Sequence, residues 1–281
     1  MSQLLKGAPV ASKINEDTAR RAEKLRQSGI TPRLVILRVG EKPDDIYYEN
    51  AAMKRCAGVG VDTDRVTMPS DISQDALIRE VRRLNEDESV HGMLILRPLP
   101  RQIDDEAVRE ILLPEKDVDG ITGLSLAGVF TGSGRGFAPC TAEACMEILD
   151  HYGVSLSGAR TAVIGRSLVI GKPVAMLLVA RNATVTICHT RTKDIPSIIA
   201  QSDIVVSAAG KIGTVKADML SSKQVVIDVG MNTDEAGNLC GDVELLAAEV
   251  AAAVTPVPGG VGSVTTALLA RHVVAAAEKS V

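Results

Sequence analysis

The segment TAVIGRSLVIGKPVAMLL (residues 161–178) has the order strand, glycine turn, helix. An apolar run ends at Gly165, and Gly171 precedes Pro173, which fits the first turn of a helix because its missing N–H has no intrahelical partner there. Glycines in such a turn let backbone N–H groups approach a phosphate, and the following helix N-terminus favours an anion. The spacing differs from G-x-G-x-x-G, so a βα turn without a ligand remains the alternative.

Further apolar runs alternate with helical patterns on both sides of this segment. The runs are nearly continuous rather than alternating, which is typical of parallel strands covered on both faces. The expected strands are residues 34–39, 92–97, 161–165, 184–188, 203–208 and 224–229. The expected helices are residues 44–58, 72–86, 141–152, 171–181 and 193–201, with a last apolar helical pattern at 264–279. Strand–helix alternation predicts an α/β fold with right-handed crossovers.

The length of 281 residues predicts two domains, since a domain usually has ~100–200 residues. A glycine-rich stretch with one proline, FTGSGRGFAPCT, lies at residues 130–141 and indicates a loop or linker. We therefore expect the boundary between residues 120 and 140. A second irregular stretch, TPVPGGVGSVT (255–265), has the composition of an ordered loop beside a ligand.

Composition and charge exclude several classes of protein. The formal charge of −4 argues against a broadly basic nucleic-acid surface, and only 2% of residues are aromatic, which argues against stacking on bases. Five cysteines without a CxxC pair argue against a disulfide framework or a zinc site, and for a reducing compartment. No apolar stretch reaches the ~18–20 residues of a membrane span, and the N-terminal residues lack a signal peptide's apolar block. We expect a cytoplasmic protein with no nucleic-acid or membrane partner.

The strand that follows the glycine turn ends in CHTRTKD (188–194). In a dinucleotide-binding fold this position faces the adenosine ribose, where an acidic residue would select NAD. The chain instead offers Thr190 and Arg191, with Arg166 in the preceding turn, and guanidinium groups suit a 2′-phosphate. The sequence thus favours NADP over NAD, the alternative being a solvated basic loop. The expected cofactor-binding residues are Gly165, Arg166, Ser167, Thr190, Arg191 and Met231.

Two further segments carry carboxylates. KDVDG (116–120) places Asp117 and Asp119 two residues apart, where they suit a metal, a polar heterocycle or a simple turn. No other acidic or histidine ligand clusters nearby, so no metal site is expected. VIDVGMN (226–232) places Asp228 at the end of a strand, where a ligand contact and a turn role are about equally expected.

Several strings together resemble the methylenetetrahydrofolate dehydrogenase/cyclohydrolase family. They are the tyrosine segment after GEKPDD, the PLP and KDVDG segments, GRSLVIGKP, DVGMN and, most distinctively, TPVPGGVG. The resemblance implies a folate-facing α/β domain at residues 1–139, completed by the C-terminal helix at 268–281, and a Rossmann-like cofactor domain at 140–267. It also implies a homodimer and a cleft between the domains.

The resemblance further implies oxidation of 5,10-methylene-tetrahydrofolate to 5,10-methenyl-tetrahydrofolate with NADP or NAD. By position, Tyr48 matches the family's active-site tyrosine and Asp119 its folate-contacting aspartate, and Lys54 is the first lysine after that tyrosine. The expected catalytic residues are therefore Tyr48, Lys54 and Asp119. The expected substrate-binding residues are Tyr48, Asp119, Pro258, Gly259, Gly260 and Val261.

The chain departs from the family at the second catalytic step, hydrolysis of the methenyl product. Bifunctional relatives have Tyr-x-x-x-Lys on a helix, but Ala52 stands four residues after Tyr48. Lys54 lies about 120° around the helix from that tyrosine at ~100° per residue. Leu96, followed by Arg97, replaces the family's partner glutamine. Alanine and leucine cannot activate a water, so we expect cyclohydrolase activity to be weak or absent.

Two other functions share some of these features. A dehydrogenase of another small acid, such as a shikimate-type substrate, would share the cofactor domain but has no reason to carry TPVPGGVG. A non-catalytic nucleotide-binding sensor would bind the cofactor without turning over methylene-tetrahydrofolate.

Overall fold

The computed structural model describes residues 2–280, and these form two compact units. The large-sheet unit comprises residues up to Ala11 together with Thr141–Thr265. The small-sheet unit comprises Ser12–Cys140 and the residues from Thr266 onward. The main difference from the expected domain ranges is that residues 2–11 group with the large-sheet unit.

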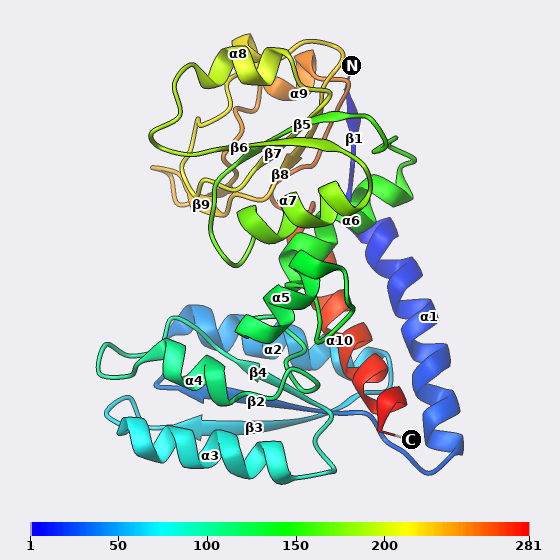
Figure 1. The fold of residues 1–281 in the computed structure, drawn as a ribbon, viewed down its shortest axis with the longest axis vertical. Coiled ribbons are helices and arrows are strands. Elements are labelled where there is room, and N and C mark those ends of the chain that lie inside the picture. Colours follow the sequence, from blue (N-terminus) through cyan, green and yellow to red (C-terminus); the bar gives the residue numbers. More distant parts are fainter. Residues whose placement is uncertain (1, 281) are drawn as a thin grey trace. The chain divides into compact units, whose positions relative to one another are not determined.

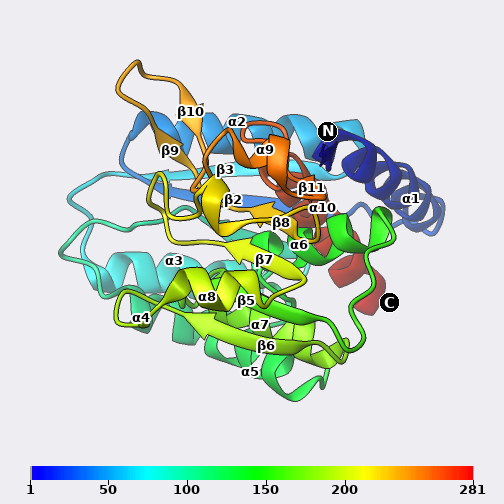
Figure 2. The ribbon, with the colours of Figure 1, turned by 90° about the horizontal axis from the view of Figure 1, so that it is seen from above.

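The large-sheet unit contains a six-stranded sheet in the order β1-β11-β8-β7-β5-β6, in which all neighbouring strands are parallel. Strands β5 to β8 lie side by side in both views (Figures 1 and 2). Its strands are β1 (Gln3–Leu4), β5 (Arg160–Ile164), β6 (Thr184–Cys188), β7 (Ile204–Ser207), β8 (Val225–Asp228) and β11 (Ala253–Val254). The chain steps from β5 outward to β6 and then returns to β7 on the other side of β5. Open α/β sheets bind ligands at such a reversal, beside the carboxyl ends of the strands.

Helices and one small ribbon complete this unit. The helices are α6 (Cys140–His151, whose first residue belongs to the other unit), α7 (Gly171–Ala180), α8 (Ile195–Ala200), the 3-10 turn Ala217–Met219 and α9 (Ala247–Val250). The antiparallel ribbon pairs β9 (Asn232–Thr233) with β10 (Leu239–Cys240). Buried aliphatic residues from β5, β7, β8 and α8 form the core on one face of the sheet.

The small-sheet unit has a parallel sheet in the order β3-β2-β4. Its strands are β2 (Arg33–Val39), β3 (Asp62–Met68) and β4 (Gly92–Ile95). Its helices are α1 (Gly7–Gln27), α2 (Pro43–Gly58), α3 (Gln74–Glu86), α4 (Asp105–Ile111), α5 (Gly123–Thr131) and α10 (Gly262–Lys279). The unit boundaries fall inside the continuous helices α1 and α10.

The structure confirms the predicted α/β class and all six predicted strands, with ends shifted by up to two residues. It adds β3, which was not predicted because its sequence, DTDRVTM, is largely polar. Within the part of the chain that the structure describes, no helix is long and apolar enough to span a membrane.

A buried ion-pair cluster holds α2 against the small sheet. Glu49 on α2 is almost fully buried, and its Oε2 accepts a hydrogen bond from Arg38 Nε of β2 at 2.8 Å. Its Oε1 lies 2.7 Å from Arg65 Nε of β3. Two guanidinium groups therefore compensate one buried carboxylate, and they fix the helix turn that also carries Tyr48.

Replacing Glu49 with alanine should destabilise the protein strongly. The substitution leaves Arg38 buried without its carboxylate, and breaking a buried pair typically costs about 3–5 kcal/mol. Urea unfolding measures the change in the free energy of unfolding. Glu80→Ala is the matched control, because it removes a helix carboxylate whose partner, Arg83, is exposed, and it should cost less than about 1 kcal/mol. Equal losses for the two variants would contradict this assignment.

Candidate active site

The glycine turn after β5 is shaped by two close backbone approaches. Gly165 has a φ of +128°, and a Cβ at this position would overlap the Ala208 carbonyl oxygen after β7. A Cβ at Gly171 would overlap the Gly165 carbonyl oxygen. Only glycine fits both positions, because any side chain would force the turn open. The turn is therefore built for close packing at the edge of the sheet where α/β folds bind ligands.

Ser167 organises the start of α7. Its Oγ accepts hydrogen bonds from the backbone N–H of Ile170 at 3.1 Å and of Gly171 at 3.4 Å. Residues 166–169 are exposed, so this turn presents backbone and side-chain donors to solvent. A tight glycine turn with exposed donors before a helix fits the phosphates of a dinucleotide.

The remaining predicted cofactor residues lie at the same edge of the large sheet. Arg166 follows β5, Thr190 and Arg191 follow β6, and Met231 follows β8 with 79% of its surface exposed. Arg166 and Arg191 are exposed and have no ion-pair partner among residues 2–280. His189 Nδ1 accepts a hydrogen bond from the Arg191 backbone N–H at 3.1 Å and so shapes this loop.

Two buried aspartates connect the loops that follow β7 and β8. The Asp242 carboxylate accepts hydrogen bonds from the backbone N–H groups of Ala209, Gly210 and Lys211, and from the Ser207 hydroxyl and the Asn232 amide. The Asp228 carboxylate accepts hydrogen bonds from the backbone N–H groups of Gly230, Asp242 and Val243. Burial raises the pKa of Asp228 to about 6, although these hydrogen bonds favour the carboxylate. Of the two roles considered for Asp228, the structure displays the turn role.

The small-sheet unit brings Tyr48 and Asp119 together. Tyr48 lies on α2, which follows β2, and Asp119 lies in the loop between α4 and α5. Burial, reinforced by the nearby Asp119, raises the pKa of Tyr48 well above its usual value, so its phenol stays protonated. Burial and the neighbouring Asp117 raise the pKa of Asp119 to about 7, while His272, the Cys140 thiol and Arg97 oppose this rise. A phenol donor thus stands beside a carboxylate that titrates near neutral pH.

Asp117 has a structural role. Its carboxylate accepts hydrogen bonds from the backbone N–H groups of Ile121 and Thr122 and from the Ser125 hydroxyl, at 2.6 to 2.9 Å. These bonds fix the turn that leads into α5. Across residues 2–280 no group of three or more His, Cys, Asp or Glu side chains is arranged to hold a metal ion.

The resemblance to the family links positions 52 and 96 to hydrolysis, and Lys54 is the lysine that follows position 52. Ala52 is fully buried and Leu96 is almost fully buried, whereas Lys54 is exposed. The charged and thiol groups that act on Tyr48 are Asp119, Cys140 and Cys56, and Lys54 is not among them. Arg97 donates a hydrogen bond from Nε to Asp105 at 2.6 Å and is held in this ion pair.

The loop that contains Pro258, Gly259, Gly260 and Val261 belongs to the large-sheet unit. Gly7 donates its backbone N–H to the Gly259 carbonyl at 2.8 Å, and a Cβ at Gly7 would overlap the Gly260 carbonyl oxygen. Gly259 has a φ of +99°, which favours glycine. The N-terminal segment therefore supports this loop, while Tyr48 and Asp119 belong to the other unit.

Sequence reasoning missed the residues that surround Asp119. Cys140 and His272 are buried, lie 132 residues apart in the chain, and approach each other to 3.6 Å between Sγ and Nδ1. A histidine beside Arg271 within the largely apolar segment LLARHVVAAA was the available signal. Asp242 was missed because most of its partners are backbone N–H groups, which leave no side-chain pattern.

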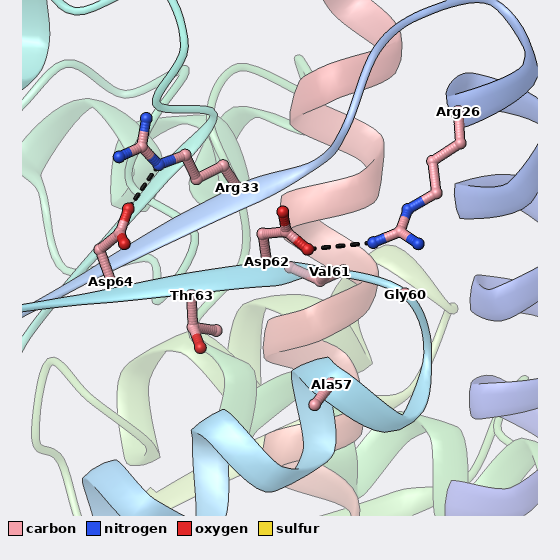
Figure 3. Close-up of a pocket in the computed structure, with 8 residues that line it drawn as sticks. All are labelled: Arg26, Arg33, Ala57, Gly60, Val61, Asp62, Thr63 and Asp64. Atoms are coloured by element: carbon pink, nitrogen blue, oxygen red, sulfur yellow. Dashed lines mark hydrogen bonds and ion pairs between the residues drawn. The ribbon is translucent and has the colours of Figure 1, made fainter.

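A surface pocket in the small-sheet unit contains none of the predicted site residues. Its lining includes the Arg26–Asp62 pair at 3.0 Å and the Arg33–Asp64 pair at 2.5 Å (Figure 3). Arg33 and Asp62 begin β2 and β3, so the pocket lies at the amino-terminal edge of the sheet. Ligands of open α/β sheets bind at the opposite edge, and each guanidinium here already has a carboxylate partner.

Comparison with known proteins agrees with this geometry. The model for the tetrahydrofolate dehydrogenase/cyclohydrolase catalytic domain matches residues 5–119, and the model for the NAD(P)-binding domain of the same family matches residues 139–281. The bifunctional protein FolD of Alkaliphilus oremlandii is 48% identical over 277 residues, covering 98% of this chain and 97% of that protein.

Solved structures give the same result over the whole chain. The bifunctional FolD enzyme of Campylobacter jejuni has a TM-score of 0.97 and 33% identity, with 100% of both chains covered. The Trypanosoma brucei methylenetetrahydrofolate dehydrogenase-cyclohydrolase, solved with NADP and an inhibitor, has a TM-score of 0.92 and 36% identity over 99% of this chain and 98% of that one. The resemblance seen in the sequence is thereby confirmed, and the chain belongs to the tetrahydrofolate dehydrogenase/cyclohydrolase family.

Proposed function

We propose that this protein is a cytoplasmic, NADP-dependent dehydrogenase that oxidises 5,10-methylene-tetrahydrofolate to 5,10-methenyl-tetrahydrofolate. The observation that carries the proposal is the half-buried Tyr48 beside Asp119, at positions that correspond to the family's tyrosine and folate-contacting aspartate. The small-sheet unit with α10 is the folate-facing domain, and the large-sheet unit is the cofactor domain. A cytoplasmic location agrees with five cysteines that are all free thiols.

The residues of the large-sheet unit fit NADP. The turn at Gly165 and Gly171 suits the pyrophosphate, and the exposed guanidinium groups of Arg166 and Arg191 suit the ribose 2′-phosphate. Ser167, Thr190 and Met231 complete the cofactor surface. When bound, the nicotinamide supplies a hydride acceptor.

The small-sheet unit binds and orients the folate. The reacting carbon is flanked by two nitrogens that stabilise the product cation, so the oxidation requires placement more than a protein base. The Asp119 carboxylate accepts hydrogen bonds from the N–H groups of the pterin ring. Tyr48, kept protonated by its surroundings, donates a hydrogen bond toward the reacting end of the substrate. The Pro258–Val261 loop contributes main-chain contacts to the substrate.

The test follows the absorbance of reduced cofactor with methylene-tetrahydrofolate, using NADP and NAD in parallel. We expect turnover with a preference for NADP. Cofactor binding without turnover would favour a nucleotide-binding sensor. Turnover with a different small acid, and none with the folate, would favour the other dehydrogenase.

Arg166→Ala should weaken NADP binding at least tenfold and NAD binding much less. A charge-assisted hydrogen bond contributes about 1.5–3 kcal/mol, and only NADP carries the 2′-phosphate. Titrating each cofactor against intrinsic fluorescence or by calorimetry measures both dissociation constants. Arg160→Ala is the matched control, since Arg160 is an exposed arginine at the other end of β5. Equal losses for the two cofactors would assign Arg166 to the shared pyrophosphate instead.

We also propose that the protein is a homodimer. Strand β3 is an edge of the small sheet, and none of its seven residues is buried, so its outer backbone groups can pair with a second copy. Light scattering should give twice the chain mass of 29.6 kDa. The mass of a single chain at micromolar concentration would refute this.

A further inference from the structure

A buried group of side chains surrounds Asp119, and its central member is a histidine from the last helix. His272 on α10 is only 4% exposed, and its Nδ1 lies 2.8 Å from the Val118 carbonyl oxygen. A carbonyl oxygen only accepts hydrogen bonds, so Nδ1 carries the proton and donates it to Val118. The imidazole therefore holds the peptide that directly precedes Asp119.

The ring plane of His272 is fixed by stacking. Phe137 lies parallel to the imidazole, with 4.8 Å between ring centroids and 28° between planes. The Lys279 ammonium lies 4.8 Å from the Phe137 ring centroid. The aromatic pair is buried, so the imidazole is held from its face as well as through its hydrogen bond.

The Cys140 thiol reinforces this contact. Its Sγ donates a hydrogen bond to the Val118 carbonyl oxygen at 3.3 Å and lies 3.6 Å from His272 Nδ1. A carbonyl oxygen has two lone pairs, so it accepts hydrogen bonds from the imidazole and from the thiol together. The two side chains therefore hold the same peptide, the one that directly precedes Asp119.

We propose that His272 is a positioning residue for Asp119, which strengthens folate binding by holding the Val118 peptide that directly precedes the carboxylate. This inference rests on the proposed function, in which Asp119 binds the pterin ring. The groups that face Asp119 are Asp117, Cys140, His272, Arg97 and Tyr48. His272, Cys140 and Arg97 favour its ionised form, whereas Asp117 opposes it, so loss of His272 raises the pKa of Asp119.

The first experiment measures tetrahydrofolate binding by calorimetry without cofactor. His272→Leu should raise the dissociation constant about tenfold at pH 7, the size of one charge-assisted hydrogen bond. His272→Asn, whose amide can still donate to Val118, should recover most of the affinity. In the Asp119→Ala background, His272→Leu should change the affinity less than twofold, because it acts through the carboxylate. His91→Leu is the matched control: His91 is buried in the same unit, where it accepts a hydrogen bond from the Arg33 backbone N–H, and its loss should leave folate affinity unchanged.

The second experiment needs no ligand. The carboxyl carbon of Asp119, identified by its absence in Asp119→Asn, is titrated by NMR in the wild type and in His272→Asn and His272→Leu. We expect a higher pKa of Asp119 in the leucine variant and a near-wild-type value in the asparagine variant. Unchanged titration and unchanged folate affinity in a folded leucine variant would overturn the inference. Wild-type protein that binds no tetrahydrofolate would instead refute the proposed function, and the titration would still decide the link between His272 and Asp119.

Discussion

Purified protein should leave 5,10-methenyl-tetrahydrofolate to hydrolyse at close to its uncatalysed rate. The resemblance to the family implies a lysine four residues after the active-site tyrosine and a glutamine before the PLP segment, whereas this chain has Ala52 and Leu96 at those positions. Both side chains are buried and neither can orient or deprotonate a water. General acid–base assistance is typically worth ~10²–10⁴-fold, so losing it should remove nearly all enzymatic hydrolysis. The decrease in methenyl absorbance with and without protein measures the rate.

Lys54→Met is the informative control for this prediction. Lys54 is exposed on α2, so its replacement should change neither the hydrolysis rate nor the dehydrogenase rate. Arg97 is held by Asp105, which keeps its guanidinium in an ion pair. A large protein-dependent hydrolysis rate that disappears in Lys54→Met would show that Lys54 is the catalytic lysine in a shifted register.

Asp119→Asn should lower kcat/KM for methylene-tetrahydrofolate by about 10- to 100-fold at pH 8. In the proposed function the ionised carboxylate accepts charge-assisted hydrogen bonds from the pterin ring, each worth about 1.5–3 kcal/mol, and an amide would accept weaker ones. The pKa of Asp119 is about 7, so wild-type kcat/KM should fall as the pH drops below 7, by about tenfold per unit. The asparagine variant should lack this acidic limb. Steady-state rates measured from about pH 5.5 to about pH 8.5 test both the acidic limb of the wild type and its absence in the asparagine variant.

Protein stability provides an independent check on the same carboxyl group. In the folded protein the pKa of Asp119 is raised from the usual 3.8 to about 7. The contribution of this carboxyl group to the free energy of unfolding is therefore complete below pH 3.8 and is lost as the pH rises through about 7. Asp119→Asn should therefore reduce the loss of stability between pH 5 and 8. Asp218→Asn, in an exposed turn of the large-sheet unit, should leave both the kinetic and the stability profiles unchanged. An unaltered acidic limb in Asp119→Asn would assign that limb to another group.

The buried strands were predictable because parallel strands that are covered on both faces have nearly unbroken apolar sequences. TVTIC at Thr184–Cys188 was located to the residue. Strand β3 was not located, because an edge strand faces solvent and carries Asp62, Arg65 and Thr67 among its exposed residues. An edge strand is held by backbone hydrogen bonds to its neighbour, and these bonds do not require an apolar sequence by which the strand could be recognised.

The candidate site also contains residues that could be predicted from the sequence and residues that could not. The turn at Gly165 was visible because close backbone approach requires glycine, and Tyr48 and Asp119 were found through the resemblance to a family. His272 was not found, because its contact with Val118 joins residues that are 154 positions apart. Such a contact depends on tertiary packing of α10, and no local pattern encodes it.

The pairing of β1 with β11 has a consequence for how the chain can be divided. Residues 3 and 4 pair with residues 253 and 254, so an edge strand of the large sheet comes from a segment about 250 positions away from its partner. The small-sheet unit likewise takes most of α10 from a segment that follows the large-sheet unit in the chain. Neither unit corresponds to one contiguous piece of polypeptide, and separating the gene near codon 140 would leave each product missing an element held by the other. Each unit is therefore complete only when contacts between sequence-distant residues have formed, and such contacts slow folding because a long loop must close first.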